Sequence, residues 1–346
     1  MASQKPFIHD LSYPDLEHQL AAMGEPAFRA KQIWVALYQN LISDIQEVTT
    51  LPKELRDKLC DVFSFSELAS IKALESKDGL THKTLFKLGD GALIEAVLMK
   101  YDQRRTLCIS SQSGCQLGCV FCATGQMGFT RNLTSGEIVA QVLHYAQRLA
   151  AQGERVTNVV MMGMGEPFLN YEHVMAAIDR LNDPEGLGLG ARRITISTVG
   201  IVPKIKQFAD AGSQVNLAIS LHTVDDALRT QLMPINKQFP VKSILDACRD
   251  YVDKTNRRVT FEYALIEGVN DSKMDAELLA QRIRGLLCHV NLIRLNPTAG
   301  YDKHGTTSDH VTAFCDVLEA HHIPCTVRLG RGVEISAGCG QLAAEN

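Results

Sequence analysis

Three cysteines, Cys115, Cys119 and Cys122, follow one another at spacings of four and three residues. Gly114 and Gly118 lie in the same stretch, and each disfavours a helix by about 1 kcal/mol relative to alanine. Cysteines that only fill a core act as small hydrophobic residues, and they are not expected to cluster at ligand spacing in a glycine-containing stretch. The pattern therefore predicts a loop whose three thiolates bind one metal centre.

Zinc is the first alternative for this centre. A structural zinc site is closed by four ligands, usually two short Cys or His pairs. No second C-x-x-C pair occurs, and the other cysteines stand alone in the sequence: Cys60, Cys108, Cys248, Cys288, Cys315, Cys325 and Cys339. An iron–sulfur cube is usually held by four cysteines, so three thiolates would leave one iron open for a small molecule. The missing fourth ligand favours an iron–sulfur centre.

Several other residues have side chains suited to binding a small molecule. Gly165 would let the backbone approach a ligand, and Glu166 could accept a hydrogen bond from an ammonium group. The remaining candidates each have an ordinary structural alternative, as a helix cap, a core group or a turn former: Ser197, the run Ser220-Leu221-His222, and Asn296. Their common position after successive predicted strands is what makes them a set.

Three more residues have side chains that could do chemistry. Cys339 stands between glycines near the end of the chain, which predicts a mobile and accessible thiol, with an ordinary surface thiol as the alternative. Cys108 lies in a predicted strand, where by itself it is most simply a core cysteine. Glu95 is a carboxylate in an apolar strand, and strand alternation most simply points it outward.

Strand-like and helix-like runs alternate from residue 106 onward. The strand-like runs are 106–110, 156–162, 193–198, 215–221, 259–266, 289–295 and 324–329, and the helix-like runs are 135–151, 171–181, 203–211, 241–254, 273–287 and 307–321. Such alternation predicts an α/β fold with a parallel sheet, and about six units fall short of the eight of a closed TIM barrel. We expect a partial (β/α)6 TIM-like barrel with its ligands at the carboxyl ends of the strands.

The first hundred residues differ from this pattern and predict two further parts. Residues 1–68 are expected to form a small helical domain, with helices near 14–23, 26–38 and 53–62, and residues 69–105 a β-hairpin extension; residues 106–346 form the barrel domain. The helical part either packs on the barrel or docks RNA through its basic residues, although acidic residues are interleaved with them, which favours simple packing.

The composition is typical of a soluble globular protein, with 45% hydrophobic and 21% charged residues in 346. A net charge of −4 gives no overall basic field for nucleic acid. Ten cysteines, no apolar signal-peptide core at the N-terminus and no apolar run of about 18 residues indicate a reducing cytoplasmic setting without membrane insertion.

The motifs, taken in order, resemble the RlmN/Cfr family of radical S-adenosylmethionine (SAM) adenine methyltransferases. The C-x-x-x-C-x-x-C pattern with Phe121 before its last cysteine is the signature of the radical SAM superfamily. The other motifs extend the likeness over nearly the whole chain, at residues 24–32, 51–53, 108–112, 128–133, 162–167, 220–222, 233–236, 291–297 and 339–342. Residues 125–129 look more like the RlmN type than the Cfr type.

The resemblance implies a role for each candidate. Cys115, Cys119 and Cys122 would ligate a [4Fe-4S] cluster. SAM would be held by Gly165, Glu166, Ser197, Ser220, Leu221, His222 and Asn296. Cys339 would accept a methyl group as S-methylcysteine, Cys108 would resolve it through a transient disulfide, and Glu95 would remove a proton from adenine. The helical domain would help to dock RNA.

The implied reaction also explains why two separate cysteines are needed. Carbon 2 of adenine is electrophilic, so direct attack on SAM cannot methylate it, and covalent catalysis divides the task into steps. Cys339 would take a methyl group from one SAM, and a second SAM would supply a 5′-deoxyadenosyl radical. The expected substrates are 23S rRNA at the peptidyl-transferase centre and the anticodon loop of tRNAs, and the alternative is Cfr-type methylation of carbon 8. We further expect a monomer and an external one-electron donor such as flavodoxin or ferredoxin.

Overall fold

The alternating β-branched and apolar runs form the parallel sheet that the sequence predicts. In a computed structural model, which describes residues 5–328 and 330–344, the parallel strands follow chain order across one sheet. They are β4 (Arg105–Cys108), β7 (Asn158–Met161), β8 (Ile194–Thr198), β9 (Asn216–Ser220), β10 (Val259–Leu265), β11 (Cys288–Arg294) and β12 (Cys325–Val327). Residue 329, the last of the final predicted strand, lies outside the described residues.

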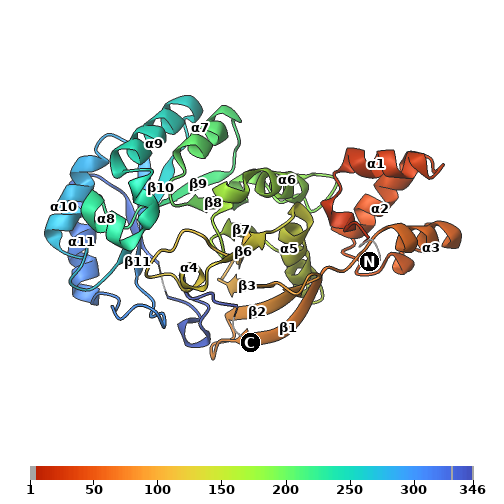
Figure 1. Cartoon of the computed structure of the whole chain (residues 1–346), viewed down its shortest axis with the longest axis horizontal. Coiled ribbons are helices and arrows are strands. Elements are labelled where there is room, and N and C mark those ends of the chain that lie inside the picture. Colours follow the sequence, from red (N-terminus) through yellow and green to blue (C-terminus); the bar gives the residue numbers. More distant parts are fainter. Residues whose placement is uncertain (1–4, 329, 345–346) are drawn as a thin grey trace.

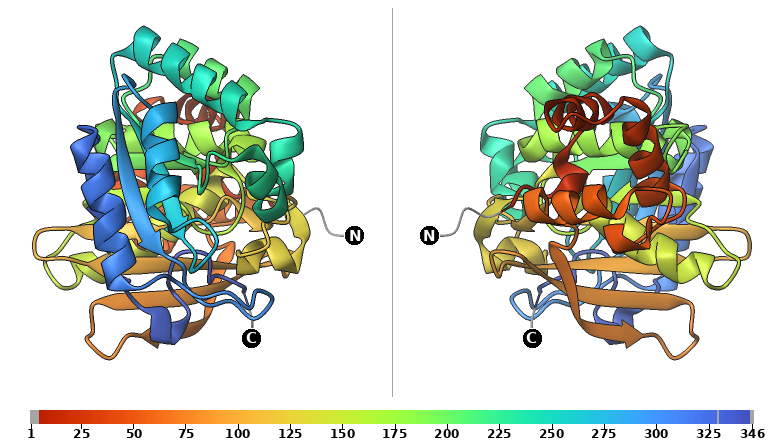
Figure 2. Two further views of the ribbon diagram at one scale, coloured as in Figure 1. Left: turned by 90° about the vertical axis from the view of Figure 1, so that its left-hand side faces the viewer. Right: turned by 90° about the vertical axis from the view of Figure 1, so that its right-hand side faces the viewer.

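Helices connect these strands and cover the outside of the sheet (Figures 1 and 2). The predicted helices are α5 (Ser135–Ala150), α6 (Tyr171–Asn182), α7 (Val202–Asp210), α9 (Val241–Thr255), α10 (Lys273–Arg282) and α11 (Ser308–Ala320). Helix α5 begins with a capping box. The Thr134 hydroxyl accepts from the Glu137 backbone N–H, and the Glu137 carboxylate accepts from the Thr134 backbone N–H. The sequence reading did not foresee α4 (Ala123–Met127) or α8 (Asp226–Leu232), since both are too short to show a clear helical period.

The helical part contains the three expected helices, α1 (Tyr13–Ala22), α2 (Phe28–Tyr38) and α3 (Lys53–Val62). They lie beside α5 and α6, away from the strands of the barrel (Figure 1). Trp34 on α2 donates a hydrogen bond to Asp183 at 2.9 Å, and Leu16, Trp34 and Leu55 belong to the same buried cluster as the barrel core. The helical part is therefore packed onto the barrel through a shared core.

The predicted hairpin is part of a longer antiparallel arrangement. Strands β1 (Leu68–Glu75), β2 (Thr81–Leu88) and β3 (Leu93–Lys100) form a meander, and β3 pairs with β4 antiparallel. The ten strands of this sheet therefore run without a break from β1 to β12, and these two strands are its edges among the described residues. The barrel is open, as expected for a partial barrel. The meander extends its sheet.

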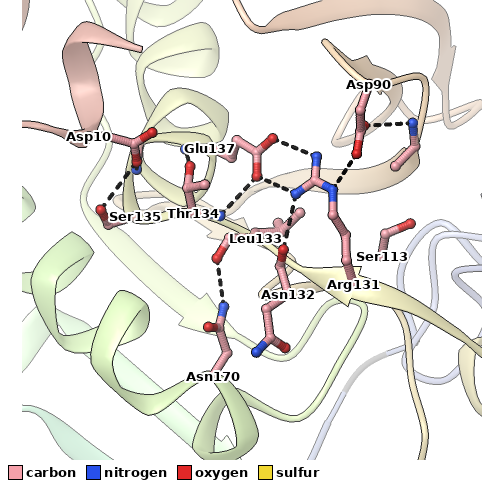
Figure 3. Close-up of polar contacts among 12 residues, drawn as sticks. Asp10, Asp90, Ser113, Arg131, Asn132, Leu133, Thr134, Ser135, Glu137 and Asn170 are labelled. Carbon is pink, nitrogen blue, oxygen red and sulfur yellow. Dashed lines mark hydrogen bonds and ion pairs between the residues drawn. The ribbon is translucent and has the colours of Figure 1, made fainter. Parts of the chain in front are cut away.

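Arg131 links the meander to barrel helix α5, and Asp10 links the helical part to the same helix (Figure 3). Arg131 lies on β6 (Phe129–Asn132) and donates to both carboxylate oxygens of Glu137, at 2.7 and 2.8 Å, and to Asp90 in the β2–β3 turn. Asp10, before α1, accepts a hydrogen bond at 2.7 Å from the backbone N–H of Gly136 in the first turn of α5. These carboxylates connect the helical part and the meander to the start of one barrel helix.

Among the described residues, no helix has both the length and the apolar character that crossing a membrane requires.

Candidate active site at the mouth of the barrel

The three cysteines lie on a loop that follows the first parallel strand. We call residues 115–122 the three-cysteine loop. Just before it, β5 (Gln112–Gly114) pairs with β6. Gly114 has a φ of +74°, and a Cβ at this position would lie 2.1 Å from the carbonyl oxygen of Gly128. Only glycine fits there. The loop also donates a backbone hydrogen bond from Val120 to the Leu232 carbonyl at the end of α8, at 3.0 Å.

The thiols of Cys115, Cys119 and Cys122 line one cavity at the carboxyl ends of the strands, which we call the cysteine cavity. Burial raises the pKa of Cys115 to about 12 and that of Cys119 further, so without a bound cation these sulfurs are protonated. No three His, Cys, Asp or Glu side chains within residues 5–328 and 330–344 gather around a single ion. In an iron–sulfur cube each thiolate binds a different iron, and three cysteines that line one cavity suit such a cluster.

Glu166 follows β7 and lines the cysteine cavity. Its carboxylate is 2% exposed and accepts backbone hydrogen bonds from Phe168 and Val199, each at 2.9 Å. Burial raises its pKa to about 7. Each carboxylate oxygen can accept a second hydrogen bond, so the predicted contact with an ammonium group is compatible with this geometry.

Packing within the protein explains why residue 165 is glycine, in addition to the approach of a ligand that the sequence predicts. The φ of Gly165 is +99°, and a Cβ there would lie 2.5 Å from the Cβ of Gln112. The Gln112 side-chain carbonyl in turn accepts from the backbone N–H of Glu166 at 2.8 Å. Glycine is therefore required by the contact between two loops of the barrel, and Gly165 also lines the cysteine cavity.

Hydroxyl and imidazole groups complete the wall of the cysteine cavity. The hydroxyl oxygens of Ser197 and Ser220 are 3.3 Å apart, at the ends of adjacent strands. His222 accepts at Nδ1 from the backbone N–H of Ala264 at 3.0 Å, and burial lowers its pKa to about 3. The neutral ring therefore carries its proton on Nε2, where it can donate into the cavity. A largely apolar cavity with these few donors and acceptors beside three thiols fits SAM bound next to a cluster.

The contact of Leu221 with SAM stays a prediction, and its side chain lies away from the cysteine cavity. Leu221 is fully buried, belongs to the main hydrophobic core and does not line the cysteine cavity, whereas Ser220 and His222 on either side of it do. Neighbouring residues at a strand end point to opposite faces of the sheet, so Leu221 turns toward the core.

Cys339 is exposed, as predicted, and lies on a segment that is hydrogen-bonded across the barrel mouth. We call residues 337–344 the carboxy-terminal segment. The Asn296 side chain donates to the Cys339 carbonyl at 3.0 Å, and the Ala123 backbone N–H donates to the Gly340 carbonyl at 2.8 Å. Cys339 lines the cysteine cavity, and it also lines a neighbouring cavity of about 480 Å³ that contains Cys108. The segment places one thiol where these two cavities meet.

Cys108, at the end of β4, is half-buried and faces this second cavity, so it is not simply a core cysteine. Burial raises its pKa to about 12, and the nearby Cys339 adds to that shift. Both thiols therefore open into a common space, although 231 positions of sequence separate them.

The simple expectation that Glu95 points outward is wrong. Its carboxylate is 2% exposed, lies 2.8 Å from the Lys83 ammonium and accepts from the Ala343 backbone N–H at 3.0 Å. Both charged side chains line a third cavity of about 560 Å³, together with Gln341. The carboxy-terminal segment and a strand of the meander therefore enclose this ion pair beside the barrel mouth.

Three residues that contact the predicted site residues were not predicted from the sequence. Lys83 and Arg328 are ordinary cations in the sequence, and only their folded positions bring them to Glu95 and to Cys339. Arg229 is fully buried and donates to the carbonyls of Val199 and Ser220, at 2.7 and 3.1 Å. A lone arginine in a short helix gives no signal, although its position just before the 233–236 motif could have directed attention to it.

Comparisons with known proteins extend over the whole chain. The Radical SAM superfamily model matches residues 109–279, and the model described as "Ribosomal RNA large subunit methyltransferase N-terminal domain" matches residues 8–64. The chain is 47% identical to a Chloroflexus aurantiacus protein called "Probable dual-specificity RNA methyltransferase RlmN", over 100% of this chain and 94% of that protein. It is 48% identical to "Dual-specificity RNA methyltransferase RlmN 1" of Myxococcus xanthus, over 97% of this chain and 94% of that protein.

A solved structure agrees with these relatives. A radical SAM methyltransferase from Sphaerobacter thermophilus superimposes with a TM-score of 0.96 at 50% sequence identity, over 98% of this chain and 100% of that one. The similarity therefore includes the helical part and the meander as well as the barrel.

Proposed function

The chain belongs to the RlmN family of radical SAM methyltransferases, and from this premise we propose that it methylates carbon 2 of an adenine in 23S rRNA and of an adenine in the anticodon loop of tRNA. The observation that carries the proposal is the position of Cys339. Its thiol faces the cysteine cavity on one side and the cavity of Cys108 on the other. A thiol that carries a methyl group between two chemical steps requires such a position.

The cofactors follow from the family and from the residues around the cysteine cavity. Cys115, Cys119 and Cys122 would hold a [4Fe-4S] cluster through three thiolates. The SAM-binding residues would be those that line the same cavity: Gly165, Glu166, Ser197, Ser220, His222 and Asn296. When bound, these cofactors would supply a methyl group and a hydrogen-abstracting radical.

Different residues of the chain carry out the successive steps of the proposed reaction. The Cys339 sulfur accepts a methyl group, and after loss of one hydrogen its carbon bonds to the adenine ring. Glu95, held by Lys83 beside the third cavity, takes the ring proton. Cys108 then attacks the Cys339 sulfur, so a sulfur–sulfur bond forms while the sulfur–carbon bond breaks. The released carbon takes a proton and becomes the product methyl group, and the one electron left over from the radical addition would pass to a one-electron acceptor such as the oxidised cluster. The disulfide must be reduced before another cycle.

The N-terminal helices would contact RNA outside the site. Exposed Lys53 on α3 and the cation–π pair of Arg29 with exposed Phe28 on α2 supply basic and aromatic groups on that surface. A truncation that removes this helical part would also disrupt the shared core, so single substitutions are the appropriate test.

The central experiment replaces Cys339 by alanine in a strain that lacks its own enzyme. Mass mapping of adenosines from rRNA and tRNA should show loss of the methyl mark with Cys339→Ala, and retention with the matched Cys60→Ala, because Cys60 lies on α3 away from the site. Anaerobic protein should still bind about four irons per chain in both variants. Methyl transfer that persists in Cys339→Ala would refute the role of Cys339.

A second measurement tests the position on the base and the route of the methyl group. With a donor labelled as CD3, the proposed route gives a product methyl of CD2H, because one deuterium is removed while the carbon is attached to Cys339. A product retaining CD3, or a mark at carbon 8, would contradict the proposal.

A further inference from the structure

Arg328 places a positive charge between two cavities of the site. It follows β12, and its backbone N–H donates to the Leu292 carbonyl at 2.8 Å, which fixes its place at the barrel mouth. Its Nη1 atom lies 4.0 Å from the Cys339 sulfur and 3.4 Å from the Met162 sulfur. The side chain lines both the cysteine cavity and the cavity of Cys108. A guanidinium stays protonated, so this charge is permanent.

Glu262 contacts the same Nη1 atom of the guanidinium that lies near the Cys339 sulfur. It is 3% exposed on β10, and its Oε2 atom lies 3.6 Å from Arg328 Nη1 and has no hydrogen-bond partner among the described residues. Its Oε1 atom accepts from the Asn291 side chain at 2.9 Å, and Asn291 accepts from the Thr326 hydroxyl at 2.7 Å. A buried carboxylate is costly without a cation, so Glu262 favours an arginine that stays inside the barrel.

The surroundings of Cys339 otherwise disfavour a negative sulfur. Desolvation by the walls of the barrel mouth raises the pKa of the Cys339 thiol, the Arg328 guanidinium opposes that shift, and Glu262 and Cys122 add to it. The thiolate is the nucleophilic form of cysteine. Among the charged groups that face this sulfur in the described residues, Arg328 is the cation that can stabilise it.

We propose that Arg328 is a positioning residue that stabilises the negatively charged sulfur of Cys339 when it accepts a methyl group, and that Glu262 holds the guanidinium in place. The inference rests on the proposed function of Cys339. The thiol proton passes to solvent, and a sulfur lone pair forms the new sulfur–carbon bond. The bond between the methyl group and the donor sulfur breaks with its electrons on the donor. Arg328 keeps its proton throughout.

The test measures the reactivity of the thiol without cofactors, so it is independent of turnover. Cluster-free protein is treated anaerobically with iodoacetamide at a fixed pH, and the alkylation rate of Cys339 is followed by peptide mass spectrometry. Cys60 in the same digest serves as the internal reference. Arg328→Gln should slow Cys339 on the order of tenfold, because it removes a unit charge about 4 Å from the sulfur, whereas Arg328→Lys should largely restore the rate. Cys60 should be unchanged in both.

Two further outcomes make the result decisive. Glu262→Gln should slow Cys339 less than Arg328→Gln does, because the guanidinium remains, although it is less firmly held, and because the variant also removes a carboxylate charge that disfavours the thiolate. Equal Cys339 rates in wild type, Arg328→Gln and Arg328→Lys would overturn the inference, as would equal slowing in the glutamine and lysine variants, which would indicate a packing role only. Neither result depends on methyl transfer, so the failure of this inference is distinguishable from the failure of the proposed function.

Discussion

Replacing Lys83 by methionine should destabilise the protein strongly, because it isolates the Glu95 carboxylate. The two side chains are 10% and 3% exposed, and their charged atoms are 2.8 Å apart. Methionine preserves the apolar stem but leaves one hydrogen bond to the carboxylate, from the Ala343 backbone N–H. Removing one partner of a buried ion pair costs roughly 3–5 kcal/mol, and we expect the lower end of that range because the cavity admits some solvent.

A double-mutant cycle separates the pair from general damage. Glu95→Gln removes the charge that Lys83 neutralises, so the double variant Lys83→Met with Glu95→Gln should cost less than the sum of the single variants, by roughly 1–3 kcal/mol. Lys87→Met is the matched control, since Lys87 is exposed on the same strand and should change stability by less than about 0.5 kcal/mol.

Urea unfolding followed by far-UV circular dichroism measures each variant at one pH and salt concentration. The fitted slope should stay constant across the series, so that differences in midpoint report stability. Additive single variants, or a Lys83→Met cost no greater than that of Lys87→Met, would refute the reasoning that this ion pair is buried and coupled.

Three further predictions concern other positions. Gly165→Ala should lower stability by roughly 1–3 kcal/mol in urea, because its φ is +99° and a Cβ would meet Gln112 at 2.5 Å; Gly188→Ala, with φ of +65° and open space, should cost less. Arg229→Met should lower both thermal stability and iron content after anaerobic reconstitution, since it leaves buried carbonyls without donors; unchanged iron content would contradict its role behind the cysteine cavity. Burial lowers the pKa of His9 to about 3. Below about pH 6.5 the unfolded chain therefore binds a proton at His9 that the folded chain does not bind. Stability should therefore fall between pH 6.5 and 3, by roughly 1 kcal/mol for the first pH unit, and His9→Gln should flatten this dependence.

The sequence by itself determined the order of the elements and the place of the three-cysteine loop among them. Runs such as 259–266 and 289–295 can be read locally, because parallel strands buried on both faces are nearly continuous apolar stretches. The position of Cys115, Cys119 and Cys122 after the first of these strands followed from the same reading. Short elements escaped it, and α8 is the clearest example, since seven residues are too few to show a helical period.

Tertiary structure decided which side chains meet. Glu95 looks like an outward-facing residue because alternation along a strand does not say which face will be covered, and the group that covers it, Ala343, comes 248 residues later. Leu221 and Ser220 could not be separated by their position after a strand, because the pleat sends them to opposite faces. Lys83 and Arg328 acquire their partners only when the meander, the last strand and the carboxy-terminal segment converge on the barrel mouth. An ion pair between residues far apart in the sequence forms only when the fold brings them close. Here that requires the curved sheet and the carboxy-terminal segment that crosses the barrel mouth.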